Sequence, residues 1–401
     1  MRAQIANLLK KQSMRLLKKT KPTIVVVGGS VGKTTTTQAI ATVLSKKYAV
    51  TSTISNYNTD VGVPCSLFGR KFPSNLRNPF AWLVIFLMNE VTLLRPKKME
   101  VVVLELGTDT PGEMQWFEWL NADIGVLTGI QYEHMENFSS LDDLAKEEMQ
   151  IANYSEQLYV NKHTVDRGYL KFAGEIDLFN YSRDDISGTI KQQAHVIGDH
   201  SFDAFAAAQV VARQLEMNQS DIDAALKELR PQPGRMNRLR GLKESTLIDD
   251  TYNAAPAAMQ AALEYLQSVD ADHRIALLGN MNELGDISAE EHTKIGQMCD
   301  PKKLDFVVTL GPDANEYIAP AAQEKGCLVA TTTSPVQAAE LIKKELKPNS
   351  AVLLKGSQNK VYAEEATKQL LANSTDVTHL VRQSPEWMKI KTAQFPEIGR
   401  R

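Results

Sequence analysis

The 401-residue sequence has few cysteines and no long apolar run. Its three cysteines, Cys65, Cys299 and Cys327, form no C-x-x-C pair and have no histidine near them at zinc spacing. This pattern argues for a reducing compartment, the cytoplasm, and against a disulfide framework or a structural zinc site. The most apolar run, residues 79–88, is too short to cross a bilayer as a helix.

An excess of charge of one sign is also missing, because 45 Lys and Arg residues stand against 48 Asp and Glu residues. The formal net charge of -3 gives no indication of a nucleic-acid partner. The apolar and charged fractions, 43% and 23%, are ordinary for a soluble globular protein. A chain of this length can form two or three domains, each with its own core.

The N-terminal segment, residues 1–21, departs from this balance, because it contains Arg and Lys residues but no acidic residue. Leucines interleave with the basic residues at roughly helical spacing, and no continuous apolar stretch marks a secretory signal. The favoured interpretation is a solvated helical arm packed on the first domain. The alternative is a basic amphipathic helix that contacts the inner membrane face together with residues 79–88, which otherwise form a buried helix.

The segment Thr23–Thr37, TIVVVGGSVGKTTTT, carries the strongest functional signal. Its β-branched run predicts a buried parallel strand, followed by a glycine-rich turn and a helix from Thr35 to Leu44. Backbone N–H groups and the helix dipole would face a phosphate there, with Lys33 reaching the β/γ-phosphates and Thr34 positioned to ligate Mg²⁺. A tight turn with a surface lysine is the alternative, but the flanking strand and helix favour nucleotide binding.

The glycine spacing separates this loop from two common phosphate loops. Val27 stands where G-x-x-x-x-G-K-[ST] has its first glycine, and two residues separate the glycines where partitioning ATPases have one. The remaining sequence, GSVGKTT, resembles the G-[TS]-x-G-K-T-T loop of the Mur ligases, which add amino acids to peptidoglycan precursors. The resemblance implies nucleotide binding by the whole loop: Gly29, Ser30, Val31, Gly32, Lys33, Thr34 and Thr35.

Further segments resemble motifs of that family and follow in its order, most closely in the branch that adds D-alanyl-D-alanine. They are Asn56–Pro64 (N-x-N-N-x-I-G-V-P), Val101–Gly107 (E-M-G), Leu229–Met236 (P-x-P-G-R-M), Thr246–Pro256 (D-D-S-Y-N-A-N-P) and Lys355–Ser357 (K-G-S). Ala255 replaces the second asparagine of the fourth motif. The resemblance implies that Arg235, Asp250 and Asn253 complete the nucleotide site when the domains close. The adenine contact falls on Ser201 and on either Asp203 or Ala204.

Glu105 ends an apolar strand, where an unpaired carboxylate is costly to bury, and beside a phosphate loop its partner is expected to be Mg²⁺. The resemblance implies a second metal ligand at His134. It also implies a CO₂-modified lysine at a position that here is Glu148. Glu148 could supply the same negative charge to the second metal. Alternatively, Glu147 and Glu148 form a solvated face of the helix that is expected from Leu141 to Tyr154.

Alternating strands and helices predict an α/β fold with doubly wound sheets. We expect an N-terminal helix (1–21), a P-loop central domain with a mostly parallel sheet (22–230), a Rossmann-like C-terminal domain (231–373) and a loose polar tail (374–401). The family connection within the central domain is usually shorter, so residues 71–98 are expected to be an apolar insertion.

The family resemblance implies a ligase that uses ATP and Mg²⁺ to activate a carboxylate as an acyl phosphate, which an amine such as D-alanyl-D-alanine then attacks. Lys33, His134, Glu148 and Arg235 are the expected catalytic residues. A domain that holds a nucleotide-sugar peptide precedes the P-loop in this branch, whereas about two dozen residues precede it here. The alternatives are a partner protein that supplies that domain, a different carboxylate at a membrane, or a catalytically weak nucleotide-binding subunit.

Overall fold

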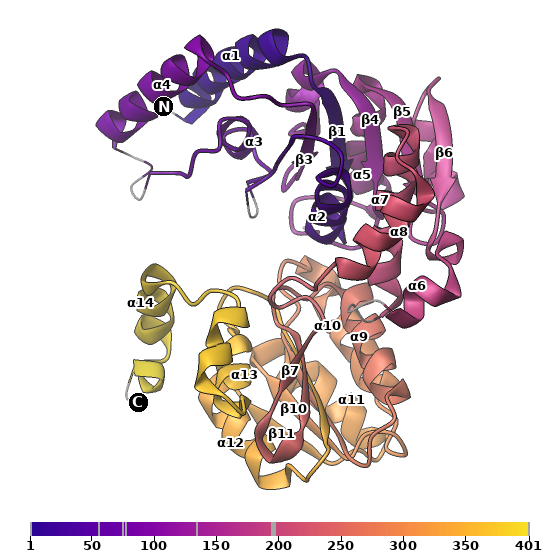
Figure 1. The fold of residues 1–401 in the computed structure, drawn as a ribbon. Helices are drawn as coiled ribbons and strands as arrows, with labels where there is room; N and C mark the ends of the chain where they lie inside the picture. The colour runs from indigo at the N-terminus through magenta and orange to yellow at the C-terminus, as the bar shows by residue number, and fades with distance from the viewer. Residues whose placement is uncertain are drawn as a thin grey trace. The chain divides into compact units, whose positions relative to one another are not determined.

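The computed structural model describes residues 2–54, 57–73, 76, 78–133, 135–193 and 198–399. Two compact units are distinguished along the chain (Figure 1). The first comprises residues 1–131, 137–195 and 199–229, and the second comprises residues 132–136, 196–198 and 230–401. Each unit has its own sheet and its own hydrophobic core.

The first unit is built on a six-stranded sheet in the order β2-β3-β1-β4-β5-β6, and all neighbouring strands are parallel. The strands are β1 (Thr23–Gly28), β2 (Val50–Ser52), β3 (Val101–Glu105), β4 (Ala122–Leu127), β5 (Ser155–Asn161) and β6 (Asp177–Tyr181). Central parallel strands are covered on both faces, which explains the nearly continuous valine runs of β1 and β3. Because β1, β3 and β4 are neighbours, their carboxyl ends meet at one edge of the sheet.

The first unit has eight α-helices in its described residues. They are α1 (Arg2–Thr20), α2 (Lys33–Leu44), α3 (Gly62–Leu67), α4 (Pro79–Leu94), α5 (Leu141–Glu148), α6 (Gly188–Gln193), α7 (Asp199–Gln214) and α8 (Gln219–Glu228). Short 3₁₀ helices are η1 (Met114–Leu120), η2 (Met149–Tyr154), η3 (Arg167–Phe172) and η4 (Arg183–Asp185). Helix α2 contacts β1 and β3 and packs beside α7 (Figure 1).

The second unit contains a sheet in the order β11-β10-β9-β12-β8-β7, parallel except for the antiparallel β7–β8 pair. Its strands are β7 (Asn237–Arg240), β8 (Thr246–Asp250), β9 (Arg274–Gly279), β10 (Phe306–Leu310), β11 (Val329–Thr332) and β12 (Ala351–Lys355). Its α-helices are α9 (Pro256–Ser268), α10 (Ser288–Met298), α11 (Ala319–Glu324), α12 (Pro335–Glu345), α13 (Glu364–Leu370) and α14 (Pro385–Gln394). Short 3₁₀ helices are η5 (Leu242–Glu244), η6 (Gly285–Ile287), η8 (Ser374–His379) and η9 (Pro396–Gly399), and η7 (Ala314–Ile318) is a short π-helix.

Helices cover both faces of the second sheet. Ala276 and Leu278 of β9 belong to the core shared with α9 and α10, whereas Ile275 and Leu277 belong to the core shared with α12 and α13. This alternation follows from the two-residue period of a strand. Both sheets confirm the predicted α/β fold, with a mostly parallel sheet in the first unit and a Rossmann-like second unit.

The structure corrects three local expectations. The tail after residue 373 is not loose, because it forms η8, α14 and η9 and buries Lys391 completely. Helix α4 is not fully buried, since Leu87 and Leu94 on one face are 58% and 79% exposed. The predicted helix from Leu141 to Tyr154 ends as an α-helix at Glu148 and continues as the 3₁₀ helix η2, a tightening that is common at helix ends.

Candidate active site

The phosphate loop joins the end of β1 to the start of α2. Its backbone is left-handed at Gly29, with φ 119°, and at Gly32, with φ 81°, a conformation that residues with a side chain rarely adopt. The N–H of Ser30 donates to the carbonyl of Gly129, which follows β4, at 2.8 Å. The segment after β4 therefore helps to hold the loop in this shape.

Gly29 is the position where the loop has least room. A Cβ atom there would lie 2.5 Å from Thr128 Oγ1 and 2.8 Å from the carbonyl oxygen of Gly129. Thr128 is itself fixed, because its hydroxyl donates to the carbonyl of Val31 at 2.6 Å. The sequence prediction missed Thr128, and its place directly after a buried strand was the only signal for it. The loop is therefore a cradle in which glycine lets the backbone approach its neighbours closely.

The first turn of α2 carries Lys33, Thr34 and Thr35, all partly exposed. The ammonium of Lys33 donates to the carbonyl of Ser30 at 3.1 Å, so this side chain folds back over the loop. The first N–H groups of any helix lack partners within it, and together with the helix dipole they attract anions. The loop thus combines backbone donors, a helix N-terminus and an ammonium group, as a phosphate site requires.

Glu105 lies beside this loop, because it pairs in register with Val27, two residues before Gly29. Its side chain is 2% exposed and accepts a hydrogen bond from Asn58 Nδ2 at 3.0 Å. Asn58 lies in a loop that the sequence singled out, but its partner was not predicted because it is 47 residues away. Carboxylate and hydroxyl oxygens are ligands that Mg²⁺ prefers, so Glu105 and Thr34 fit that ion chemically.

Glu148 also reaches the phosphate loop, through a backbone contact. One of its carboxylate oxygens accepts the N–H of Gly29 at 2.8 Å, and the side chain is 1% exposed. The neighbouring Glu147 is buried too and accepts the N–H groups of Gly112 and Met114 at 2.8 and 2.7 Å. The alternative of a solvated glutamate face is therefore wrong.

The second metal site cannot be built from the described residues. His134 lies outside them. In the part of the chain that the structure describes, no group of three or more His, Cys, Asp or Glu side chains could hold a metal ion. One partner of Glu148 is the amide of Gly29, a contact that the sequence did not predict.

In the second unit, backbone N–H groups of the segment Gly234–Met236 form hydrogen bonds with carboxylates at the end of β8. The N–H of Gly234 donates to Asp249 Oδ2 at 3.0 Å, and the N–H of Met236 donates to Asp250 Oδ1 at 3.1 Å. The guanidinium of Arg235, between them, lies over the ring of Tyr252 with its carbon 4.0 Å from the ring centroid. Such stacking orients the guanidinium plane, so the two motifs form one structural unit around Arg235.

Asp250 is paired with a lysine that was not among the predicted site residues. Lys355, 1% exposed at the end of β12, donates to Asp250 Oδ2 at 2.5 Å and to the carbonyl of Asn253 at 3.1 Å. Opposite charges satisfy each other in such a buried pair. Asp250 and Asn253 are thus brought together, and Lys355 fixes the loop between them.

Asp249 carries a strongly perturbed carboxyl group. Burial is the main reason that its pKa rises to about 7, and the nearby carboxylates of Glu364 and Asp250 raise it further. Hydrogen bonds from the Thr251 hydroxyl, at 2.7 Å, and from the Gly234 N–H act in the opposite direction. The folded protein therefore binds a proton at Asp249 over a pH range in which the unfolded chain does not.

This proton makes stability depend on pH. Between about pH 4 and pH 7 the folded state holds a proton that the unfolded state has lost, so the free energy of unfolding should fall as pH rises, by about 1.4 kcal/mol per unit at most. The Asp249→Asn variant has no ionisable group at this position, so we expect its free energy of unfolding to lack this decrease with pH. Calorimetric melting of both proteins from pH 5 to 8 would show the native chain losing stability relative to the variant. A melting difference that stays constant with pH would contradict the assignment.

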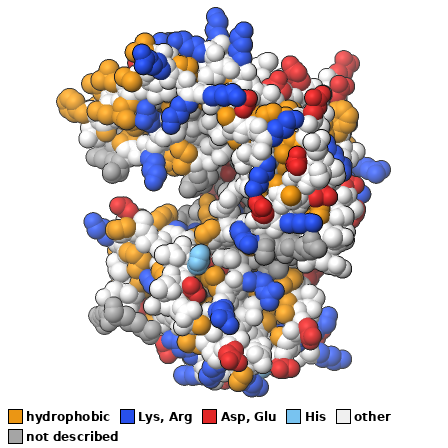
Figure 2. Space-filling model, in the orientation of Figure 1, with side chains coloured by type: hydrophobic (Ala, Val, Ile, Leu, Met, Phe, Trp, Pro, Cys, Tyr) orange, Lys and Arg blue, Asp and Glu red, His pale blue; other side chains and the backbone are white. Residues whose placement is uncertain are grey.

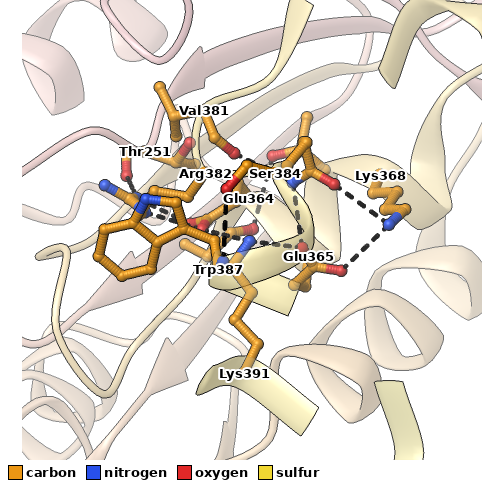
Figure 3. Close-up of polar contacts among 12 residues, drawn as sticks. Thr251, Glu364, Glu365, Lys368, Val381, Arg382, Ser384, Trp387 and Lys391 are labelled. Atoms are coloured by element: carbon orange, nitrogen blue, oxygen red, sulfur yellow. Dashed lines mark hydrogen bonds and ion pairs between the residues drawn. The ribbon is translucent and has the colours of Figure 1, made fainter. Parts of the chain in front are cut away.

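The C-terminal segment contacts the loop after β8 that contains Thr251 and Tyr252 (Figure 3). Arg382 donates to the carbonyl of Tyr252 at 2.9 Å and also to the carbonyl of Thr251. It is held in turn by Glu364 of α13, which accepts two hydrogen bonds at 2.8 Å in a bidentate pair. Arg382 was not predicted, because nothing in the local sequence of the tail reports a partner 130 residues away.

Lys391 of α14 completes this buried network. Its ammonium lies 2.8 Å from Glu364 and 2.6 Å from Glu365, and its side chain is fully buried (Figure 3). Two carboxylates on α13 are therefore neutralised by cations from the tail. The network anchors the C-terminal segment to α13 and to the loop that carries Tyr252.

The residues considered for adenine are buried in α7. Asp203 accepts the backbone N–H of Arg183 at 3.2 Å, and its second carboxylate oxygen lies 3.3 Å from the Arg183 guanidinium. Burial raises the pKa of Asp203, although the arginine opposes this change. Ser201 and Ala204 are also buried. The contacts with Arg183 give Asp203 a structural role.

Models of two protein families match most of the chain. The Mur ligase middle domain matches residues 27–218, and the glutamate ligase domain of Mur ligases matches residues 234–358. Together these ranges contain every predicted site residue. The gap between them falls at residues 219–233, and the described structure changes from the first to the second unit at residues 229–230 within it.

Individual relatives are similar over most of the chain. The UDP-N-acetylmuramoyl-tripeptide–D-alanyl-D-alanine ligase of Bacillus subtilis is 26% identical over 372 residues, which cover 87% of this chain and 76% of the relative. Among solved structures, MurF from Acinetobacter baumannii has a TM-score of 0.73 at 22% identity and covers 91% of this chain and 80% of its own. MurF ligase from Thermotoga maritima in complex with ADP has a TM-score of 0.71 at 22% identity, covering 91% and 83%.

Proposed function

The chain belongs to the Mur ligase family, and we propose that it joins D-alanyl-D-alanine to UDP-N-acetylmuramoyl-tripeptide at the expense of ATP. The observation that carries the proposal is the glycine cradle with Lys33 and Glu105 beside it, in a chain matched by both Mur ligase domains. The curated relatives that align over most of the chain have this activity by name.

The reaction has two steps. The tripeptide carboxylate attacks the γ-phosphorus of ATP, which forms an acyl phosphate and releases ADP. The amine of the dipeptide then attacks the acyl carbon, and phosphate leaves as the amide forms. Such phosphoryl transfer depends mainly on positioning and on stabilisation of charge.

Residues of this chain supply those two requirements. The N–H groups at the start of α2 and the ammonium of Lys33 hold the phosphates and neutralise charge that develops on them. Arg235, whose plane is set by Tyr252, is the proposed second cationic contact to ATP. Thr34 and Glu105 are the residues that would hold Mg²⁺, which would neutralise negative charge on the phosphates.

Glu148 is proposed to act on the loop. Its carboxylate accepts the Gly29 N–H, so it fixes the backbone that cradles the phosphates. A role as ligand of a second ion with His134 would instead require its negative charge.

The Glu148→Gln variant separates these two roles. We expect it to keep turnover within about tenfold of the native chain, because an amide oxygen still accepts the Gly29 N–H. Glu148→Ala should lose about a hundredfold, because the loop loses a support. Steady-state phosphate release would measure both. Equal damage in the two variants would show that the charge itself is needed, as for a metal ligand.

The function itself is tested by phosphate release from ATP with UDP-N-acetylmuramoyl-tripeptide and D-alanyl-D-alanine present together or omitted singly. The proposal expects release only with both, and a product with the mass of the UDP-N-acetylmuramoyl-pentapeptide. ATP binding without turnover would overturn the proposed reaction for the isolated chain. Turnover restored by a second protein would indicate a partner that supplies part of the substrate site.

We also propose a cytoplasmic enzyme that contacts the inner face of the membrane peripherally. The three cysteines are free and buried, which suits a reducing compartment. Helices α1 and α4 support the membrane contact, because one is rich in basic residues and the other exposes apolar side chains.

A further inference from the structure

Helix α4 exposes an apolar face that a protein in water normally covers. Of the 14 large hydrophobic side chains that are exposed in the described part of the chain, seven lie on this helix. They are Phe80, Leu83, Val84, Leu87, Met88, Val91 and Leu94, with exposed fractions from 43% to 79%. Their spacing of three and four residues places them on one side of the helix. Apolar patches of this kind mark interaction sites.

The opposite side of α4 is fixed against α1. Asn89 is fully buried and donates to Gln12 Oε1 at 3.0 Å, while Gln12 donates to the carbonyl of Phe86 at 3.0 Å. The guanidinium of Arg15 donates two hydrogen bonds to the carboxylate of Glu90, at 2.7 and 2.9 Å. These polar contacts set the rotation of α4, so the exposed apolar face is a defined feature of the fold.

Basic side chains flank this face. Helix α1 has no acidic residue, and its exposed lysines include Lys11, Lys18 and Lys19. Lys97 and Lys98, just after α4, are exposed as well. Figure 2 shows hydrophobic side chains gathered over α4 with Lys and Arg side chains beside them.

The composition of this surface favours lipid over protein as its occupant. Protein interfaces are depleted in lysine and draw much of their energy from Trp, Tyr and Arg. Here the rim is rich in lysine, and Phe80 is the one aromatic residue among the seven exposed side chains. An apolar helix face with a rim of lysines instead matches the acyl boundary and the phosphate headgroups of an anionic bilayer.

We infer that α1 and α4 form a docking surface for an anionic membrane, with the exposed face of α4 in the acyl boundary and the lysines at the headgroups. At 1.5 Å per residue, the 16 residues of α4 extend about 24 Å, less than the roughly 30 Å of a bilayer core. Among the described residues, no helix is long and apolar enough to cross a bilayer. The surface therefore lies on the membrane. This inference rests on the proposed membrane contact and is independent of the ligase reaction.

Vesicle flotation of the full chain tests the inference. We expect binding to phosphatidylglycerol vesicles at low salt, weaker binding at high salt, and no binding to phosphatidylcholine vesicles. Leu87→Asp should reduce binding at least about tenfold, because it places a charge in the apolar face. Leu328→Asp is the matched control, since Leu328 is 59% exposed in the second unit, and it should bind as the native chain does.

The basic rim has its own variant pair. Lys11→Gln combined with Lys18→Gln should weaken binding roughly fivefold per lysine, while Lys302→Gln combined with Lys303→Gln removes the same charge elsewhere and should have no effect. Circular dichroism would confirm that the variants fold. Absence of binding to either vesicle, equal binding to both, or an unchanged Leu87→Asp variant would overturn the inference.

Light scattering distinguishes the remaining occupants of α4. A native dimer that Leu87→Asp converts to a monomer, without vesicle binding, would assign the face to a second copy of the chain and overturn the lipid assignment. Phosphate release measured on the same variants in the absence of vesicles should be unchanged. Failure of the ligase reaction would leave the flotation result intact, so the two proposals can be judged separately.

Discussion

Replacing Gly29 with alanine should lower ATP-dependent turnover at least about a hundredfold, because displacement of a catalytic backbone by about 1 Å has an effect of that size. The new Cβ would lie 2.5 Å from Thr128 Oγ1 and within 2.9 Å of the backbone nitrogen of Gly129. Its φ of 119° is also strained for alanine. The loop would have to move, and the cradle with it. Phosphate release and nucleotide binding by calorimetry would measure the loss.

The matched control for this variant is Gly188→Ala. Gly188 begins α6, and a Cβ atom there meets nothing within 4 Å. Alanine also favours a helix over glycine, so activity should be unchanged and stability equal or slightly higher. Native turnover in Gly29→Ala would contradict the assignment of this loop as the phosphate site. A loss in both variants would indicate a general sensitivity to alanine and not a local one.

Lys391→Met should produce the largest loss of stability outside the active site. Its ammonium lies between Glu364 and Glu365, all three side chains being at most 3% exposed. Removing one partner of a buried ion pair leaves uncompensated charge and costs about 3–5 kcal/mol. For a unit of this size, we expect the melting temperature of the C-terminal transition to fall by roughly 10 °C. Differential scanning calorimetry would resolve this transition.

Lys389→Met is the control, because Lys389 is exposed on the same helix. A surface substitution of this kind changes stability by at most about 0.5 kcal/mol. Restoring balance with Glu365→Gln in the Lys391→Met background should recover part of the loss, since one of the two carboxylates then carries no charge. An unchanged melting temperature in Lys391→Met would mean that the tail does not contribute to the folding of the second unit.

The network also connects the tail to the proposed nucleotide site. Arg382 is held by Glu364 and in turn holds the carbonyl groups of Thr251 and Tyr252. Tyr252 carries the guanidinium of Arg235 on its ring. The C-terminal segment therefore supports the loop on which the proposed ATP contact depends.

Much of the fold could be predicted from local patterns. The valine run before Gly28 specifies a buried parallel strand, and the glycines that follow allow the left-handed turn into α2. The family motifs predicted that Arg235 and Asp250 belong to one nucleotide site. In the structure, the N–H of Met236, next to Arg235, donates to Asp250. These features were predictable because strand periodicity, turn chemistry and motif spacing are properties of neighbouring residues.

Contacts between residues that are far apart in the sequence could not be predicted from local patterns. Glu148 lies 119 residues from Gly29, and only the packed first unit shows that its carboxylate holds the loop amide. The tail reads as polar and loose, yet burial opposite Glu364 and Glu365 makes Lys391 and Arg382 structural.

The sequence by itself thus determined the α/β fold, the glycine-rich loop between β1 and α2, and the family. The tertiary structure decided which carboxylates are buried, which cations neutralise them and which face of α4 remains in contact with solvent. The physical reason is that a sequence pattern records the period of one element, whereas the desolvation of a charge or an apolar face depends on what packs against it from elsewhere in the chain.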